Sequence, residues 1–560
     1  MQTKKLTLFA LLTVLLLALV ACGGAATQTP PPEPTDEPME EEPMGEFVGM
    51  SVTNDACGPA DYISAITAND EYTVTFDLCK PDPAFISKVA FVPFGIQPAE
   101  YIEAEGGSGA LLEAPIGTGP YRLVEWARGE SITFESFADY WGEPAKADTL
   151  IFRWAAEGAT RLLELQAGQV DYITNVSPDD LQTVINDPNL QLLPGANPNI
   201  MYLAFINTLE PYNDVRVRQA IALGLDRQRI IDNFYPEGST VADYFTPCSI
   251  ANGCEGEPFW EFDPEAGRAL LAEAGFPDGF DTKIYYRDVF RVYLPEPSLV
   301  AVEIQTQLQE NLGINAEVVV LESGEFIQSA TQGQLDGLYL LGWGADYPHV
   351  TNFLDFHFGR SVIQFGNSFP EIYEPLEAAG VIADIATAAP FYAQANNAIR
   401  ELVPMVPVAH GAAANAASAS LVGAYYPPFG APQYALMDPG DDTLVIMQSA
   451  EPISLYCADE SDGESLSACE QVVQALFAYQ TDSGDTQPEL ATECVANADS
   501  TQWVCTLRQG VLFHDGSKFD ANDVVASYAA GLDASSPLHV GNSGAFDYYA
   551  YLWGLINDGE

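Results

Sequence analysis

The stretch Leu338–Asp355, LYLLGWGADYPHVTNFLD, decides how this chain is interpreted. It opens with the short apolar run Leu338–Leu341, which has a glycine on each side, Gly337 and Gly342. A short apolar run between turn-forming residues is typical of a buried strand. The stretch therefore predicts a core strand that breaks at its second glycine.

The residues after that strand have the composition of a binding pocket. Gly342 and Gly344 let another backbone approach closely, since neither carries a side chain. Asp346 follows between two aromatic residues, Trp343 and Tyr347. Apolar walls, accessible backbone groups and one charge are what a small amine-bearing ligand requires. The alternative is a strand that ends in an ordinary turn, with aromatic rings that fill a core.

The amino-terminal residues predict an export signal. Two lysines precede the apolar run Leu6–Val20, which is shorter than the ~20 residues of a membrane-spanning helix. The ending Leu19–Cys22 resembles a bacterial lipobox, which implies removal of Met1–Ala21 and lipid attachment to the sulfur of Cys22. The alternative is a plain secretory signal. Residues 22–50 are acidic and rich in proline, so we expect them to form a tether.

The composition of the whole chain excludes several classes of partner. Its 560 residues are 48% hydrophobic with a mean hydropathy of +0.02, which fits a large soluble body with a core. The chain has 21 Lys and Arg against 79 Asp and Glu, a formal net charge of −58. Nucleic-acid binding requires clustered basic residues, so we expect no nucleic-acid partner and no adhesion to anionic lipid.

The cysteines fit an exported protein. Eight of them follow Cys22, none with the CxxC spacing of a zinc site, so disulfide bonds are expected. Cys494 and Cys505 flank a turn-rich link ahead of the predicted strand Gln502–Leu507, which indicates a stapled hairpin. The full pairing is a hypothesis, because eight cysteines allow ~105 connectivities. Neighbours along the chain form the couples Cys57 with Cys79, Cys248 with Cys254, Cys457 with Cys469, and Cys494 with Cys505.

Helices and strands alternate in the middle of the body. The pair Asp263-Pro264 predicts a helix start, because aspartate caps a helix and proline suits its first position. Asn213-Asp214 predicts another helix start, and Asp226-Arg227 is interpreted as an ion pair on a helix surface. We then expect strand 282–286, helix 300–312, strand 315–321, helix 326–333 and strand 338–342. This rhythm predicts an α/β fold with a sheet covered by helices.

No catalytic signature stands out in the sequence. The five histidines form neither an HExxH motif nor an i, i+4 zinc pair, and no GxSxG elbow or phosphate-binding loop occurs. His514 is interpreted as a hydrogen-bonded turn residue. We therefore expect a protein that is not an enzyme and that has no cofactor and no metal.

Several segments resemble the solute-binding proteins of peptide-type ABC importers, extracellular solute-binding protein family 5. Each motif is weak alone, but together they cover nearly all of the chain after the tether. They are GTGPYRLVEW at 117–126, LQAGQVD at 165–171, DVRVRQA at 214–220, AEAGFPDGF at 272–280, GWGADYP at 342–348 and LRQGVLFHDG at 507–516. The resemblance implies a type II periplasmic-binding-protein fold with three lobes and a cleft between them.

The order of the segments departs from that family. The part that resembles the family's opening, 443–560, comes last here, and the short polar link Met437–Asp442 follows the family's end. The sequence therefore predicts a circularly permuted chain; the alternative is a slice of a tandem array or a misassembled gene. By resemblance, the first lobe combines 151–262 with 421–477, the second combines 51–150 with 478–560, and the third is 263–420.

The resemblance also implies residues for the site. At the position of Asp346, family members hold the α-ammonium of a peptide ligand, against the ring of Trp343 and beside Tyr347. Backbone groups at Gly342 and Gly344 are expected to pair with the extended peptide. The opposite strand edge resembles the loop that carries Gly463 and Glu464.

The function that follows is a lipid-anchored receptor that captures a peptide or a related small solute and passes it to ABC permease and ATPase subunits. We expect a monomer on the outer face of the cytoplasmic membrane, attached through lipid only. The alternatives are the same fold as a sensor or surface binding protein, a non-peptide solute such as a sugar or metal chelate, and an extracellular hydrolase.

Overall fold

The computed structural model describes residues 47–58, 61–195, 198–382 and 384–558. The predicted signal segment 1–21, Cys22 and most of the predicted tether lie outside these ranges. The last four tether residues, 47–50, are described and contact the body. The Met50 amide donates to Asn522 Oδ1 at 2.7 Å, and its carbonyl accepts from the Ala68 amide at 2.9 Å. The body therefore begins earlier than the predicted boundary at 51.

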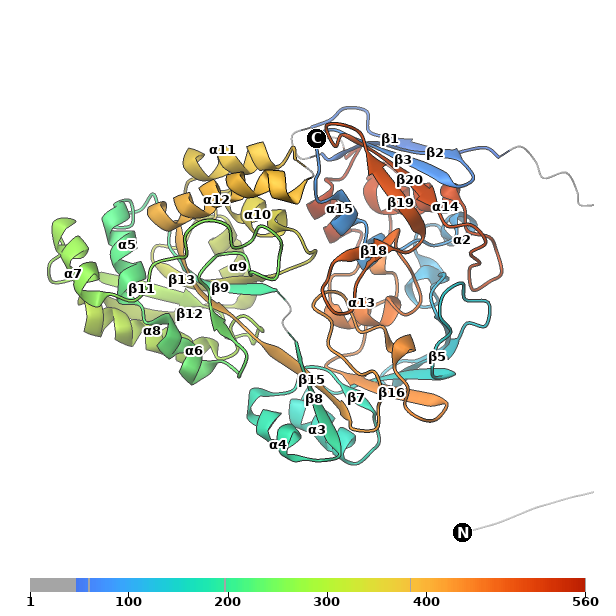
Figure 1. Cartoon of the computed structure of the whole chain (residues 1–560), viewed down its shortest axis with the longest axis horizontal. Helices are drawn as coiled ribbons and strands as arrows, with labels where there is room; N and C mark the ends of the chain where they lie inside the picture. The colour runs from blue at the N-terminus through green and yellow to red at the C-terminus, as the bar shows by residue number, and fades with distance from the viewer. Residues whose placement is uncertain (1–46, 59–60, 196–197, 383, 559–560) are drawn as a thin grey trace, which may run out of the picture. The chain divides into compact units, whose positions relative to one another are not determined.

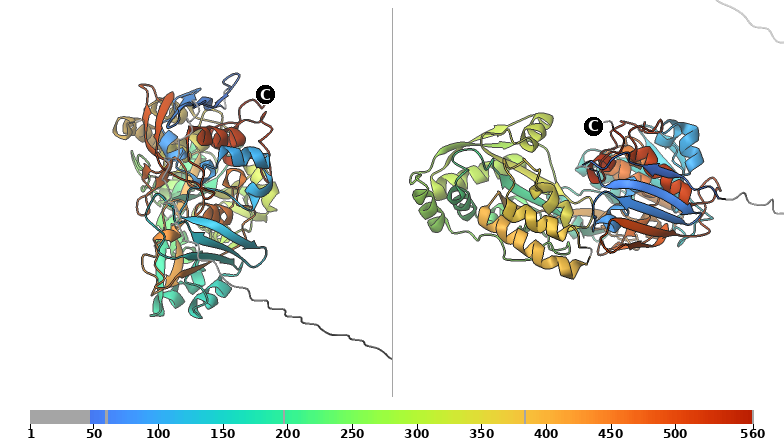
Figure 2. Two further views of the ribbon diagram at one scale, coloured as in Figure 1. Left: turned by 90° about the vertical axis from the view of Figure 1, so that its right-hand side faces the viewer. Right: turned by 90° about the horizontal axis from the view of Figure 1, so that it is seen from above.

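The described residues form a mixed α/β fold, which confirms the predicted class. One sheet has five strands and unites the beginning and the end of the described body, blue and red in Figure 2. Along this sheet the order is β1 (Ser51–Thr53), β2 (Ile63–Asp70), β3 (Thr73–Leu78), β20 (Gln502–Leu507) and β19 (Ala491–Ala496). At its edge, Asn557 Nδ2 donates to the Thr53 carbonyl at 3.0 Å.

A second sheet has seven strands. Its order is β4 (Tyr121–Ala127), β5 (Ser131–Ser136), β6 (Thr149–Trp154), β16 (Thr443–Gln448), β7 (Tyr172–Ile173), β15 (Ala413–Ser418) and β8 (Leu190–Gly195). The strand that begins the segment 443–560, β16, lies parallel to β6 and β7. β4 and β5 come from the range expected in the second lobe, yet they belong to this sheet, so its hydrogen bonding crosses the expected boundary at 150.

The third sheet has six strands and contains the predicted core strand that begins at Leu338. Its order is β10 (Thr240–Val241), β14 (Met405–His410), β9 (Asn199–Ala204), β13 (Leu338–Gly344), β11 (Asp281–Tyr286) and β12 (Asn315–Val320). Helices α5 (Val215–Gly224), α7 (Pro264–Glu273) and α8 (Pro297–Leu312) lie beside it in Figure 1. The predicted caps are confirmed: Asp214 Oδ1 accepts from the Arg216 amide, and Asp263 Oδ1 accepts from the Ala266 amide.

The remaining elements complete the body. A fourth sheet pairs β17 (Phe477–Tyr479) with β18 (Thr486–Pro488). The other helices are α1 (Phe85–Lys88), α2 (Ala99–Glu105), α3 (Gly158–Gln166), α4 (Leu181–Asn186), α6 (Arg227–Phe234), α9 (Ser323–Thr331), α10 (Leu354–Phe358), α11 (Pro370–Ala379), α12 (Ile385–Leu402), α13 (Gly463–Cys469), α14 (Ala521–Leu532) and α15 (Asp547–Leu552). None of the helices in the described ranges is long and apolar enough to cross a bilayer.

Two neighbouring chain segments connect the six-stranded and seven-stranded sheets. The chain passes from β8 to β9 and, in the opposite direction, from β14 to β15. Asn199 joins the two passages, because its side chain donates to the Gly411 carbonyl at 2.7 Å and accepts from the Gly411 amide at 2.8 Å. This one side chain therefore holds the start of β9 against the segment that follows β14.

The four predicted disulfide bonds are confirmed: Cys57–Cys79, Cys248–Cys254, Cys457–Cys469 and Cys494–Cys505. Cys494 and Cys505 stand opposite each other in the hairpin of β19 and β20, as expected. The interpretation of Asp226-Arg227 as a surface ion pair is wrong. Arg227 is 5% exposed and donates to the carbonyls of Ala242, Trp260 and Pro407, while Asp226 caps α6 through the Arg229 amide.

Candidate ligand-binding site

A cavity of about 290 Å³ brings together residues from distant parts of the chain. Asp346 lines it from the segment after β13, Gly463 and Glu464 line it from α13, and Tyr548 lines it from α15. The structure thus places three of the predicted site residues around one space. Its volume lies at the lower end of the ~300–1,000 Å³ range of small-molecule sites.

Asp346 is held in place by Asn352, a residue that is 3% exposed. The side-chain amide of Asn352 donates to Asp346 Oδ2 at 3.0 Å, and its Oδ1 accepts from the Asp346 backbone amide at 3.1 Å. The same Oδ1 accepts from Trp343 Nε1 at 3.1 Å. One amide side chain therefore fixes both the carboxylate and the aromatic ring beside it.

The carboxyl group of Asp346 has no basic partner among the described residues. Burial raises its pKa to about 6, and the hydrogen bond from Asn352 opposes part of that rise. Burial, and then the charge of Asp346, also raise the pKa of Tyr551. A half-buried carboxylate that faces a cavity without a counter-ion is able to bind a cationic group.

Trp343 and Tyr347, unlike Asp346, do not line this cavity. The Trp343 ring stacks on Phe356, with 4.3 Å between centroids, and lies parallel to Tyr551 at 6.3 Å. Tyr347 is 5% exposed and lines a separate cavity with Lys88, so it points away from the carboxylate. Trp343 thus supports the site through Asn352, whereas Tyr347 packs in the core behind it.

The two predicted glycines differ in their surroundings. At Gly342 a Cβ atom would lie 2.3 Å from the Tyr293 ring and from the Ile200 carbonyl, so glycine is required for packing. At Gly344 nothing lies within 4 Å of that position. β13 pairs with β9 as far as Gly344 but with β11 only at its start, so within the described strands one side of its end is open.

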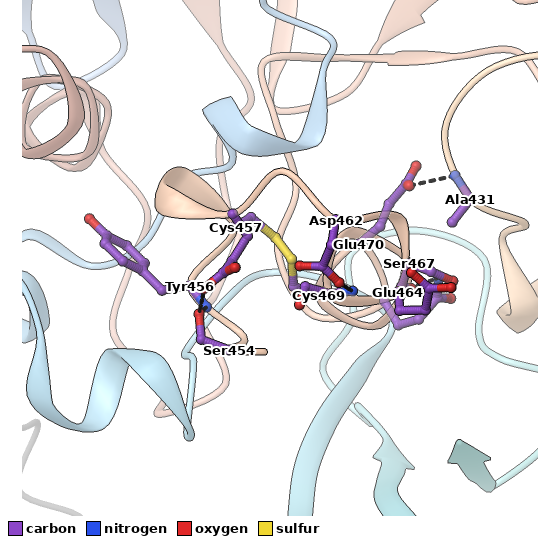
Figure 3. The surroundings of a disulfide bond; sticks show 12 residues. Ala431, Ser454, Tyr456, Cys457, Asp462, Glu464, Ser467, Cys469 and Glu470 are labelled. Atoms are coloured by element: carbon purple, nitrogen blue, oxygen red, sulfur yellow. Dashed lines mark hydrogen bonds between the residues drawn. A yellow bond between two sulfur atoms is a disulfide. The ribbon is translucent and has the colours of Figure 1, made fainter. Parts of the chain in front are cut away.

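The opposite wall of the cavity is α13, drawn in Figure 3. Gly463 is exposed, with open space where a side chain would be, and Glu464 Oε1 accepts from the Ser449 hydroxyl at 2.6 Å. The disulfide bond Cys457–Cys469 ties the end of this helix to the preceding loop. Asp462 caps the helix by accepting from the Ser465 amide.

Sequence reasoning missed three polar residues at the site: Asn352, Gln448 and Glu470. Gln448 ends β16, and Glu470 follows α13; both line the cavity. Both lie in the segment that resembles the family's opening, but neither was assigned to the site, because only the packing of the sheets brings them to Asp346. Asn352 lies six residues after Asp346 within the stretch Leu338–Asp355, and this proximity in sequence is the one signal that could have found it. No group of three or more His, Cys, Asp or Glu in the described ranges is arranged to hold a metal.

The chain matches the sequence profile of "Bacterial extracellular solute-binding proteins, family 5 Middle" over residues 38–364 and 485–545. It is 33% identical over 358 residues to di/tripeptide-binding protein 1 of Pseudomonas aeruginosa, covering 62% of this chain and 66% of that relative, just under two thirds. It is 32% identical over 382 residues to a dipeptide-binding protein of the same species, covering 66% and 70%. A heme-binding protein A of Haemophilus influenzae is 29% identical, covering 66% and 69%.

Two solved structures have the same fold. HbpA2 from Haemophilus parasuis matches with a TM-score of 0.62 and 29% identity, covering 68% of this chain and 76% of that one. A dipeptide-binding protein from Pseudoalteromonas in complex with Met-Leu matches with a TM-score of 0.56 and 27% identity, over the same shares. The predicted type II periplasmic-binding-protein fold is therefore confirmed.

Proposed function

Because this chain belongs to the family 5 bacterial extracellular solute-binding proteins, whose members are transport binding proteins and not enzymes, we propose that it captures short peptides. Two relatives named for di- or tripeptide binding and a matching structure that holds Met-Leu support this substrate class. The peptide occupies the cavity beside Asp346.

The observation that carries the proposal is the unpaired carboxylate of Asp346. A peptide's α-ammonium supplies the missing positive charge, and a charge-assisted hydrogen bond in a half-buried site is stronger than its counterpart on the surface. Binding of the ammonium favours the ionised form, so it lowers the raised pKa of Asp346.

The backbone of the peptide pairs with open backbone groups of the protein. Gly344 at the end of β13 and Gly463 at the start of α13 both have open space where a side chain would be. Main-chain pairing of this kind is independent of the side chains of the ligand. These backbone contacts by themselves therefore do not select among peptide sequences.

Capture is completed by closure at the paired crossings that Asn199 joins. The closing bodies are the part that carries the six-stranded sheet and the part that carries the seven-stranded sheet. The crossings fall inside the predicted lobes 151–262 with 421–477 and 263–420, and β4 and β5 of the predicted lobe 51–150 with 478–560 belong to the seven-stranded sheet, so these bodies cut across the predicted bounds. The closed monomer then delivers its peptide to ABC permease and ATPase subunits. A sensor or surface binding protein would bind the same ligand; adjacent genes for two permeases and an ATPase distinguish transport from that role.

The location and the chain order are further parts of the proposal. Cleavage after Ala21 and lipid on Cys22 anchor the protein to the outer face of the cytoplasmic membrane. The permuted order of the segments is compatible with the fold, since Asn557 near the end of the body contacts Thr53 and Asp55 near its start.

The test is a thermal-shift series on the purified chain with short peptides in free and N-acetylated form. A ligand that binds the folded state raises the melting temperature by mass action. We expect free peptides to raise it and acetylated peptides to have little effect. If neither form shifts the melt, peptide capture is wrong, and sugars and metal chelates become the ligands to measure.

A further inference from the structure

The cavity holds two carboxylates besides Asp346. Glu464 lies in the first turn of α13, and Glu470 directly follows that helix. None of the described residues that line the cavity is a lysine, arginine or histidine. A ligand that enters therefore meets negative formal charge on two walls and positive charge on none.

Glu470 is built into its position. Its Oε2 accepts from the Ala431 amide at 2.7 Å, as Figure 3 shows. Gly430 has a φ of +67°, and a Cβ atom there would lie 2.8 Å from Glu470 Oε1, so glycine is needed for this close approach. Burial raises the pKa of Glu470 to about 7, and the hydrogen bond from the Ala431 amide opposes part of that rise.

Two buried acceptors in the same cavity also lack donors. Gln448 is 2% exposed; its amide nitrogen donates to the carbonyls of Ala450 and Glu464, but its Oε1 accepts no hydrogen bond from the described residues. Thr174 Oγ1 is likewise buried without a partner in the described part of the chain. Each unsatisfied buried acceptor costs about 1–3 kcal/mol, so a ligand rich in N–H groups fits better than an apolar one.

The basic residue Arg161 interacts electrostatically with Glu464 and not with Glu470. Arg161 is within electrostatic range of Glu464, but it does not line the cavity. Its guanidinium donates to the backbone carbonyls of Ala155, Ala156, Thr174 and Asn175. Arg161 therefore compensates part of the charge of Glu464. Glu470 forms no ion pair within the described ranges, although Arg508 lines the neighbouring cavity that Glu470 also borders.

We propose that the cavity selects ligands with a second cationic group, which are peptides that carry a lysine or arginine side chain. Asp346 holds the α-ammonium, Glu470 holds the side-chain cation, and Gln448 and Thr174 accept its hydrogen bonds. This inference rests on the proposed function and narrows its substrate class.

The test compares each lysine peptide with its norleucine counterpart by isothermal titration calorimetry. Norleucine has the same carbon chain without the ammonium, so the ratio of the two dissociation constants isolates the second charge. The pairs are Lys-Ala with Nle-Ala, and Ala-Lys with Ala-Nle. In the wild-type protein we expect the lysine member of at least one pair to bind about tenfold tighter.

Two variants locate the effect. Glu470→Gln keeps an acceptor for the Ala431 amide and should bring the ratio to about one. Asp523→Asn is the matched control: Asp523 is also a buried carboxylate that accepts a backbone amide, from Ala99 at 2.8 Å, but it lines neither this cavity nor the neighbouring one that Glu470 borders. It should leave the ratio unchanged.

The outcomes separate this inference from the proposed function. Equal binding of lysine and norleucine peptides to the wild type overturns the second cation site, while peptide capture stands. A preference that survives Glu470→Gln overturns the assignment to Glu470. Failure of all four peptides to bind overturns peptide capture itself. The ratio of the lysine and norleucine dissociation constants is measured on the wild-type protein, so this part of the test does not depend on whether a variant folds.

Discussion

Asp346 is an acid whose pKa, about 6, lies above the ~3.9 of an unfolded aspartate. Between these values the folded protein holds the proton more tightly, so raising the pH through this window lowers the free energy of unfolding. Above pH 6 the ligand-free protein carries a half-buried negative charge without a partner. Below pH 4 both states are protonated, and the residue contributes no pH dependence.

The substitution Asp346→Asn tests this at the residue scale. At pH 7.5 the ligand-free variant should be more stable than wild type, because a neutral amide replaces the buried charge. The expected gain in the free energy of unfolding is at most about 3 kcal/mol, and the melting temperature should rise accordingly. At pH 4 the two melts should coincide. The same variant should bind free-amine peptides weaker by a few kcal/mol. A variant less stable than wild type at pH 7.5, or equal to it in peptide affinity, contradicts the assignment.

Asn352 sets the protonation of Asp346 as well as its position. The hydrogen bond from Asn352 lowers the pKa of the Asp346 carboxyl, so Asn352→Ala should raise that pKa further above 6. The pH at which affinity for a free-amine peptide falls by half should rise accordingly, as measured by titrations at a series of pH values. Thr351→Val serves as the neighbouring control, since Thr351 contacts Tyr347 and not Asp346. An unchanged pH profile in Asn352→Ala would refute this role.

At the scale of elements, the site depends on two short helices, α13 and α15, which are fixed by contacts with residues outside the cavity. α13 is tied through Cys457–Cys469 to the loop that contains Asp459. Asp459 in turn accepts from the backbone amides of Asn542, Gly544 and Phe546, the segment just before α15. One carboxylate and one disulfide bond therefore link the wall with Gly463 to the wall with Tyr548.

Removal of that disulfide by Cys457→Ala with Cys469→Ala should lower both stability and peptide affinity. The matched control removes Cys494–Cys505, which closes a loop of similar length, 11 residues apart against 12, within a hairpin that does not line the cavity. Both variants should lose about 2–4 kcal/mol of stability. Only the first should weaken binding, by roughly tenfold, since α13 must then be ordered by the ligand. If both variants lost the same affinity, the disulfide bond Cys457–Cys469 would have no specific role in positioning α13.

At the scale of the molecule, the order of the segments matters less than the contacts between them. The two ends of the described body meet in the five-stranded sheet, and the link at 438–442 is exposed apart from Pro439. Its Gly440 has a φ of +84°, as turns require. A chain can be opened at such a link and closed at such a seam without loss of a core contact.

A reordered chain, 440–558 followed by a linker and 47–439, should therefore fold to the same structure. Asn557 contacts Thr53, and the six residues back to 47 span at most about 20 Å, so a flexible linker of about eight residues suffices. We expect a cooperative melt within a few degrees of the original and an unchanged peptide affinity. Loss of cooperative unfolding would show that the present order is needed for folding.

Local patterns predicted what depends on near neighbours. The capping of α5 and α7 follows from Asp214 and Asp263, because a cap needs only the next two or three amides. The disulfide couples followed from cysteines close along the chain. The interpretation of Arg227 failed, since its burial against three carbonyls depends on strands and loops far from it in sequence.

The sequence by itself determined the core strand that begins at Leu338, the carboxylate that follows it and the α/β class, and it indicated the disulfide couples. The strand was predicted to break at Gly342, but pairing with β9 continues it to Gly344. These depend on periodicity, spacing and residue chemistry within short windows. Only the tertiary structure brought Asp346 to Glu464, Glu470 and Gln448, and it alone separated Tyr347 from the cavity. The physical reason is that those contacts arise where three sheets pack together, and no local pattern records which distant side chains will share a cavity.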